Sequence, residues 1–181
     1  WFEHFTPDWT PVMQQDEHVS VEVPGYKSAN AHLHLMEAFT ELYMELPDDR
    51  VQAAVVESLQ INRTRFYPPD PAQCAFHCRP DWSRVTDKSS EGLSYGHNVE
   101  FAWLMLRAQQ ALDQPLAWDH FYAYLDHALQ YGFDHQRGGL YNKGLDNQPA
   151  SDLEKVWWSQ AELLAALSVS LTHRRRDGDV A

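Results

Sequence analysis

The chain has 181 residues, of which 44% are hydrophobic and 22% are charged, and its net charge is −12. This composition is typical of a globular protein, and the length suits one domain, residues 1–181. The negative charge argues against nucleic-acid binding, which requires a basic surface that displaces counterions from phosphates. No apolar run approaches the ~18 residues that span a membrane, and no signal peptide begins the sequence, so we expect a cytoplasmic protein.

Apolar residues at helical spacing predict five helices. Asp48 and Pro115 mark the starts of two of them, because both residue types are common at helix N-termini. The basic run 173–176 is expected to close the last helix, where cations suit the C-terminal dipole. With boundaries accurate to about three residues, the predicted helices are roughly 28–45, 49–63, 95–112, 116–132 and 153–171.

Three of these helices share a pattern in which a glutamate precedes a largely apolar stretch. The glutamates are Glu37, Glu100 and Glu162, and they are separated by 63 and then 62 residues. A repeat of this length predicts an all-α fold of stacked helical hairpins, each with a buried and a partly exposed helix. The helices that carry the repeat are apolar around most of their circumference, which predicts burial. Long connections join the hairpins, and residues 137–151 have the signals of a short β-hairpin.

Two histidines stand three residues before two of these glutamates. His34 pairs with Glu37 and His97 pairs with Glu100, and this spacing places both members of a pair on one helix face. A nearby carboxylate holds a histidine in one tautomer and raises its pKa toward neutrality, as a general acid/base at pH 7 requires. The alternative is that these are ordinary surface or core histidines.

A metal site is a further alternative. His32, His34, His97 and the two paired glutamates are potential ligands. However, His32 and His34 are two residues apart and point to different faces of a helix, and neither pair has the usual Glu-x-x-His order. Cys74 and Cys78 do not form the usual paired-cysteine metal pattern and are expected to be free thiols. We therefore expect no bound metal and no cofactor.

Four segments resemble a known family. Lys27–Tyr43 (KSANAHLHLMEAFTELY) resembles the inner-helix motif of the N-acylglucosamine 2-epimerase family, particularly its cellobiose 2-epimerase branch. Ser94–Leu104 (SYGHNVEFAWL) resembles the next inner motif, and Lys155–Glu162 (KVWWSQAE) resembles a third. Trp1–Trp9 resembles the segment that leads into the first motif. The matches follow the order of the family and correspond to the central part of its fold.

The resemblance implies an (α/α)6 barrel of about six repeats, of which this chain would form about half. It implies an enzyme that opens the ring of a mono- or disaccharide and moves the proton at the carbon next to the carbonyl, through an enediolate. No metal or cofactor takes part in that transfer. The product is an epimer of an aldose, or a ketose.

Site residues follow from the resemblance by motif position. His97 matches the general base/acid, His34 a histidine that binds sugar oxygens, and Glu100 a carboxylate that orients the base. The residues assigned to substrate binding are Trp157, Trp158, Asn30 and Glu37. We also predict that His34, His97 and one of the two tryptophans converge on one concave surface, because they occupy equivalent ends of parallel inner helices.

Two features of the family fall outside the chain. A second catalytic histidine would lie beyond position 181, and a substrate-binding arginine before position 1. Epimerisation transfers a proton from one face of the enediolate to the other, so we expect the chain alone to be too short for it, whereas isomerisation can use one base. Exposed inner-helix faces, with apolar residues such as Leu164 and Leu167, would then favour homo-oligomers.

Two other interpretations stay open. In the first, the chain is a non-catalytic remnant of such an enzyme that binds carbohydrate or associates with itself. In the second, it is a barrel of the same architecture that cleaves glycosidic bonds. Cleavage requires a pair of carboxylates, which Glu37 and Glu100 could supply. That interpretation leaves their histidine partners unexplained.

Overall fold

The computed structural model describes residues 1–14, 24–85 and 93–177, with side chains described up to residue 174. These residues belong to two compact units. The first unit comprises Trp1–Pro68 and Cys74–Glu91, and the second comprises Pro69–Gln73 and Gly92–Ala181. The expectation of one domain over residues 1–181 stays a prediction.

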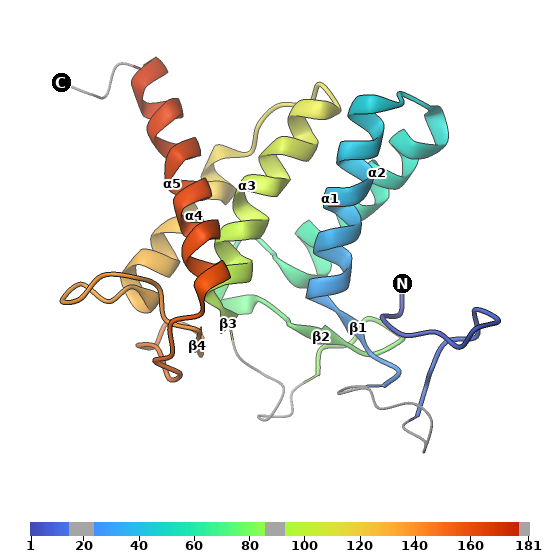
Figure 1. Ribbon diagram of the computed structural model, residues 1–181, viewed down its shortest axis with the longest axis horizontal. Coiled ribbons are helices and arrows are strands. Elements are labelled where there is room, and N and C mark those ends of the chain that lie inside the picture. The colour runs from blue at the N-terminus through green and yellow to red at the C-terminus, as the bar shows by residue number, and fades with distance from the viewer. Residues whose placement is uncertain (15–23, 86–92, 178–181) are drawn as a thin grey trace. The chain divides into compact units, whose positions relative to one another are not determined.

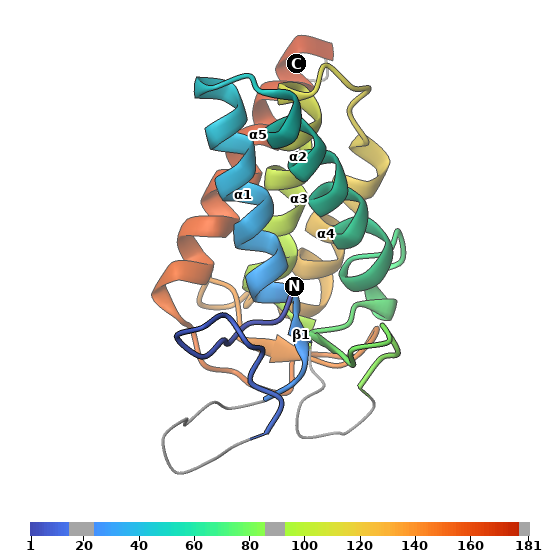
Figure 2. The same ribbon diagram turned by 90° about the vertical axis from the view of Figure 1, so that its right-hand side faces the viewer.

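The first unit is built on a helical hairpin. Helix α1 (Ala29–Glu45) and helix α2 (Asp49–Ile61) lie side by side and run in opposite directions, as Figure 2 shows. Both helices start at a polar cap. The Ser28 hydroxyl accepts from the amide of Ala31 at 3.0 Å, and the Asp48 carboxylate accepts from an amide of the first turn at 2.8 Å. These caps satisfy amides that have no partner within the helix.

The core of this hairpin lies between one face of α1 and one face of α2. The buried residues of the two helices are Ala29, His32, Leu33, Met36, Thr40, Val55, Ser58 and Leu59. Helix α2 continues into a π-helical turn, η1 (Asn62–Phe66). The buried Asn62 amide donates to the carbonyls of His32 at 2.9 Å and Ser58 at 3.0 Å, and so ties α1 to α2.

The segment that follows the hairpin returns to the start of α1. Strand β1 (Lys27–Ser28) pairs antiparallel with strand β2 (His77–Cys78). The Lys27 ammonium lies 3.8 Å from the ring centroid of Trp82 and donates to the carbonyl of Pro80 at 2.7 Å. This cation–π contact and hydrogen bond hold the segment beside the first turn of α1.

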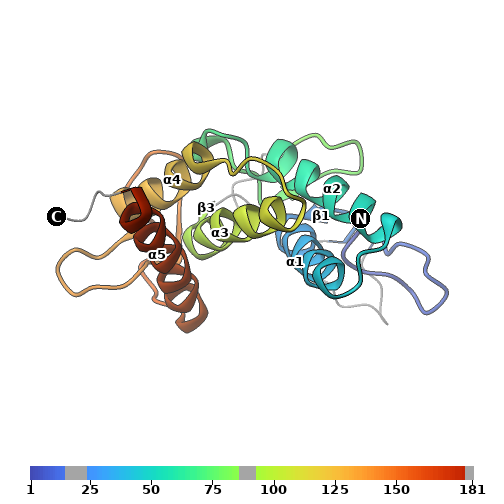
Figure 3. The same ribbon diagram turned by 90° about the horizontal axis from the view of Figure 1, so that it is seen from above.

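The described part of the second unit has three α-helices, α3 (Tyr95–Ala111), α4 (Trp118–His127) and α5 (Trp157–Asp177). Helix α3 packs against both others, and α3 and α5 lie side by side and run in the same direction (Figures 1 and 3). The ring of Trp118 stacks on His173 at a centroid distance of 3.6 Å and links α4 to α5. Because α3 and α5 are parallel, their first turns meet at one end of the unit.

Short strands and turns lie around these helices. Strand β3 (Leu93–Ser94) pairs antiparallel with strand β4 (Lys143–Gly144) and leads directly into α3. Helix α4 continues into a π-helical turn, η3 (Ala128–Gly132), and a 3₁₀ turn, η2 (Pro71–Gln73), packs against α4. The start of α3 is therefore fixed on one side by strand pairing.

Burial, predicted for the three helices that carry the repeat, is extensive in α3 but limited to one face in α1 and α5. The buried residues of α3 are Tyr95, Gly96, Asn98, Val99, Glu100, Phe101, Ala102, Leu104, Met105, Leu106, Ala108 and Gln109. On α1 and α5 a single face is buried, so the prediction is wrong for these two helices. The difference follows from the packing, because α3 has neighbours in α4 and α5 whereas α1 packs mainly on α2.

Four of the five predicted helices match the structure within three residues when the π-helical turns η1 and η3 are counted with the helices α2 and α4 that they continue. The fifth is wrong at both ends, because α5 starts at Trp157 instead of 153 and extends to Asp177 instead of 171. At the start, Asp152 forms an antiparallel bridge with Lys143, and its carboxylate accepts from the amide of Glu154 at 3.1 Å, which keeps this stretch outside the helix. At the end, the basic run 173–176 lies in the last turns, as predicted.

The β-hairpin predicted at 137–151 is replaced by two separate antiparallel bridges. Phe133 pairs with Leu140 around the turn at Gly138, and Lys143 pairs with Asp152. Strand β4 pairs with β3 instead of with a strand of its own segment. Among the described residues, no helix combines the length and apolar character that a bilayer-spanning helix requires.

We expect the free energy of unfolding to decrease as the pH falls from about 6.5 toward 4. Burial lowers the pKa of His32 from 6.5 to about 4, so in this range the unfolded chain binds a proton that the folded chain does not. The stability that depends on neutral His32 is complete above pH 6.5. It is lost as the pH falls through the pKa that His32 has in the folded protein. The full effect is about 3 kcal/mol, and urea unfolding at several pH values measures it.

His32→Gln should reduce this pH dependence. Some pH dependence of the free energy of unfolding should remain in this variant, because burial also lowers the pKa of His127. The exposed His135 provides the control, since His135→Gln should leave the slope unchanged. If the free energy of unfolding depends on pH equally in His32→Gln and in the unmodified protein, His32 is not the source of the pH dependence.

Candidate active site

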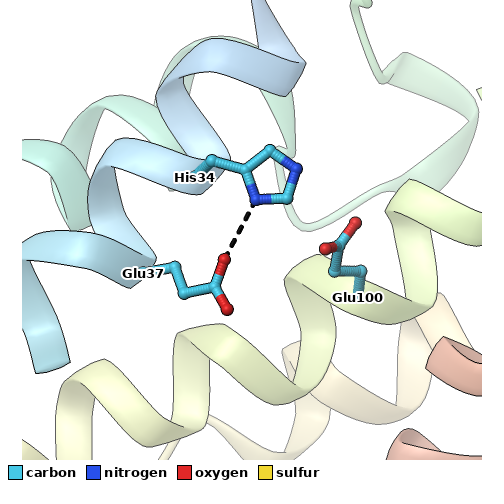
Figure 4. A group of neighbouring side chains, drawn as sticks. All are labelled: His34, Glu37 and Glu100. Atoms are coloured by element: carbon cyan, nitrogen blue, oxygen red, sulfur yellow. Dashed lines mark hydrogen bonds and ion pairs between the residues drawn. The ribbon is translucent and has the colours of Figure 1, made fainter.

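The polar candidates of the first unit form one stripe along α1. Asn30, His34 and Glu37 are separated by four and three residues, so they share a helix face that differs from the buried face. Nδ1 of His34 donates to the Glu37 carboxylate at 3.0 Å (Figure 4). The side chains of this pair are 48% and 39% exposed, which leaves them accessible to a ligand. The predicted pairing of His34 with Glu37 is confirmed.

The Glu37 carboxylate determines which nitrogen of His34 carries the proton. An ionised carboxylate only accepts hydrogen bonds, so Nδ1 of His34 is the protonated nitrogen. In the neutral ring Nε2 is then the acceptor. A hydroxyl of a ligand could donate to this nitrogen, and in the protonated ring the same nitrogen could donate to a ligand oxygen.

His32 has a different environment although it is only two residues away. Its ring is fully buried against Phe66 and Trp82, at centroid distances of 4.8 and 5.6 Å, and its Nδ1 donates to the carbonyl of Ser28 at 2.8 Å. Burial keeps this ring neutral at pH 7. His32 is therefore a core histidine, and the prediction that it points away from His34 is confirmed.

The candidates of the second unit lie at the end where α3 and α5 begin. His97 is half-buried in the first turn of α3, and its Nδ1 lies 2.7 Å from the hydroxyl oxygen of Ser94, the residue that caps the helix. Ser94 was not among the site residues predicted from the sequence. Its signal was the position of a serine three residues before His97, where an N-cap side chain approaches the third residue of the helix.

Glu100 lies one turn further along α3 than His97, on the same face (Figure 4 shows its position on α3). It is only 6% exposed. A buried carboxylate exerts a stronger electrostatic effect on nearby groups than one in water. The role of Glu100 in orienting His97 stays a prediction.

The two adjacent tryptophans at the start of α5 differ in their surroundings. The ring of Trp158 lies 4.7 Å from the ring of His97, centroid to centroid, at an interplanar angle of 66°. Gly96 makes this contact possible, because a Cβ at that position would lie 2.6 Å from the Trp158 ring. Trp157 is 79% exposed. The structure therefore brings Trp158, but not Trp157, against His97. The predicted convergence of His97 and a tryptophan with His34 stays a prediction.

The third glutamate of the repeat connects two helices. Nε1 of Trp103 on α3 donates to the carboxylate of Glu162 on α5 at 2.9 Å. Ser159, which is fully buried, occupies the position that corresponds to His34 and His97. The third repeat therefore contributes helix packing in place of a histidine–glutamate pair.

The family model described as N-acylglucosamine 2-epimerase (GlcNAc 2-epimerase) matches residues 2–179. The chain belongs to the N-acylglucosamine 2-epimerase family. It is 31% identical over 151 residues to a cellobiose 2-epimerase of Ruminococcus albus, and 28% identical over 162 residues to a D-mannose isomerase of Thermobifida fusca. The structure of the cellobiose 2-epimerase from Spirochaeta thermophila is similar, with a TM-score of 0.74 at 27% identity.

The chain spans less than half of the length of these epimerase-family relatives. The two sequence alignments cover 81% and 80% of this chain but 37% and 38% of the relatives, and the structural alignment covers 95% of this chain and 42% of the other. The predicted family and the predicted fold class, helical hairpins that form part of an (α/α)6 barrel, are confirmed.

Proposed function

We propose that this chain carries a proton-transfer residue of a sugar epimerase or isomerase. The observation that supports this best is the setting of His97, whose half-buried ring is bonded to Ser94 and flanked by Trp158. A histidine held in one orientation at the start of a helix is suited to general acid/base catalysis near neutral pH. The names of the relatives, a cellobiose 2-epimerase and a D-mannose isomerase, agree with this chemistry.

The proposed reaction starts from the open-chain sugar, in which C1 is a carbonyl carbon. Nε2 of His97 takes the proton from C2, the C2–H electron pair forms a C1–C2 double bond, and the carbonyl oxygen becomes the enediolate oxygen. Transfer of the O2 proton to O1 and return of the carbon-bound proton to C1 give the ketose. Delivery of a proton to the opposite face of C2, with return of the carbonyl at C1, gives the epimer and requires a second acid on that face. Glu100 is proposed to orient His97 and to stabilise the imidazolium that forms.

Sugar binding is assigned to the stripe on α1 and to the tryptophans of α5. His34, Asn30 and Glu37 offer hydrogen-bond donors and acceptors for hydroxyls, and a proton on His34 would assist ring opening. Trp157 and Trp158 offer flat apolar faces that suit the C–H surface of a mono- or disaccharide. A cytoplasmic location is also proposed, since two cysteines are too few for the disulfide scaffold of a small secreted domain.

Proton exchange at C2 tests the proposal, because it requires only one base. The purified chain is incubated in D2O with mannose, glucose and cellobiose, and we expect the C2 proton signal to disappear as deuterium replaces it. His97→Asn should reduce the exchange rate by roughly 100-fold or more. His135→Asn is the control and should leave the rate unchanged, because His135 is exposed and bonded to the Leu129 carbonyl. EDTA should have no effect, since the proposed mechanism uses side chains alone.

The alternatives give different results in the same experiment. Sugar binding without exchange would contradict the proposal and favour a non-catalytic carbohydrate-binding protein. Release of glucose from cellobiose that is abolished by Glu100→Gln would instead favour glycosidic cleavage with Glu37 and Glu100 as the carboxylate pair.

Self-association through α5 is a second proposal. Leu164 and Leu171 are seven residues apart and are 68% and 55% exposed, so they lie on one apolar stripe of α5. Leu167, which was also expected to be uncovered, is half-buried. Burial of a stripe of this kind between two copies would remove several hundred Å² of apolar surface from water, at roughly 25 cal/mol per Å².

We expect sedimentation velocity to show a dimer or higher oligomer at micromolar concentration. The double variant Leu164→Gln/Leu171→Gln should shift the chain toward the monomer, because it removes apolar surface from the stripe. Val56→Gln on α2, also an exposed apolar position, is the control and should not change the distribution. A monomer at every concentration tested would refute the proposal.

A further inference from the structure

The hydroxyl of Ser94 serves two groups of His97 at once. The Ser94 side chain is 5% exposed and lies where β3 leads into α3. Its oxygen lies 3.5 Å from the backbone nitrogen of His97 and 2.7 Å from Nδ1 of the same residue. Strand pairing of Ser94 with Lys143 fixes the backbone from which this side chain projects.

A comparison with α1 separates the capping role from the contact with the ring. Ser28 caps α1 in the same way and accepts from the amide of Ala31 at 3.0 Å, but Ala31 has no ring. In α3 the equivalent cap bond lengthens to 3.5 Å while the bond to the imidazole is 2.7 Å. The Ser94 hydroxyl is therefore placed to favour the ring over the cap.

We propose that Ser94 is a positioning residue that holds His97 with its proton on Nδ1, so that Nε2 is the nitrogen that exchanges protons with the sugar. This inference rests on the proposed function. A hydroxyl oxygen has two acceptor sites, and the backbone amide and Nδ1–H of His97 occupy both. Nδ1 keeps its proton in the neutral ring and in the imidazolium, so the same hydrogen bond serves both states of the catalytic cycle. The ring does not need to rotate between proton removal and proton return.

The opposite arrangement would not suit a base that acts through Nε2. If the hydroxyl donated to Nδ1, the neutral ring would carry its proton on Nε2 and could not accept another there. On protonation, Nδ1 would gain a hydrogen and the serine would have to reverse its own hydrogen bond. Neutral His97 therefore carries its proton on Nδ1 in the proposed arrangement and on Nε2 in the opposite one.

The tautomer can be measured independently of catalysis. Long-range ¹H–¹⁵N correlation spectra of histidine-labelled protein at neutral pH report which ring nitrogen of His97 carries the proton. We expect Nδ1–H to dominate in the unmodified protein. Ser94→Gly removes the hydroxyl but retains much of the capping preference, and it should give a mixture of tautomers and reduce C2 exchange by about tenfold or more.

Two further variants distinguish positioning from a general effect on folding. Ser94→Thr restores a hydroxyl and should restore the tautomer and most of the exchange rate. Ser28→Gly removes the matched cap of α1 and should lower the melting temperature to a similar extent as Ser94→Gly, without altering the His97 tautomer.

The outcomes separate this inference from the proposed function. Ser94→Gly with an unchanged His97 tautomer and an unchanged exchange rate would overturn the positioning role. A tautomer that depends on Ser94, in a protein that exchanges no C2 proton with any sugar, would support the positioning role and overturn the proposed function.

Discussion

The packing of α3 against α4 and α5 fixes the positions of the candidate catalytic groups in the second unit. Burial around nearly the whole circumference of α3 prevents it from rotating or sliding. The hydrogen bond from Trp103 to Glu162 sets the axial position of α3 relative to α5. At this axial position the first turns of α3 and α5 meet, and Trp158 lies against His97. The absence of a side chain at Gly96 allows the close approach.

The first unit shows how strongly the direction of a side chain determines its chemistry. His32 and His34 are on the same helix, two residues apart. His32 points into the core, is bonded to a carbonyl and stays neutral at pH 7. His34 points away from the core, is half-exposed and is paired with Glu37. Only His34 has the access and the charge partner that a ligand-binding histidine needs.

Sequence periodicity predicted much of this architecture. The helices α1, α2 and α3 were predicted because their apolar residues recur at helical spacing, and Asp48 marked the start of the second. The start of α5 was missed because it depends on Asp152 bridging to Lys143, a contact between residues of a loop whose path the sequence does not reveal. The one-sided burial of α1 was missed because apolar composition cannot show which neighbours a helix has.

The candidate site was predicted only in part for the same reason. The His34–Glu37 pair follows from a spacing of three on one helix, so it was visible in the sequence. The Ser94–His97 bond involves a cap hydroxyl whose usual partner is a backbone amide, so a ring partner was not expected. The different surroundings of Trp157 and Trp158 depend on the axial position of α5 relative to α3. Contacts between side chains that are far apart in the sequence, such as Trp103 and Glu162, set this position.

A sugar titration followed by NMR tests most directly whether the His97 end of the second unit is the site. The Trp118–His173 stack in the same unit provides an internal reference, because it has the same residue types away from the start of α3. Addition of mannose or cellobiose to labelled protein should shift the indole signal of Trp158 and the ring signals of His97, and leave those of Trp118 and His173 unchanged. Shifts confined to Trp118 and His173 would contradict the account.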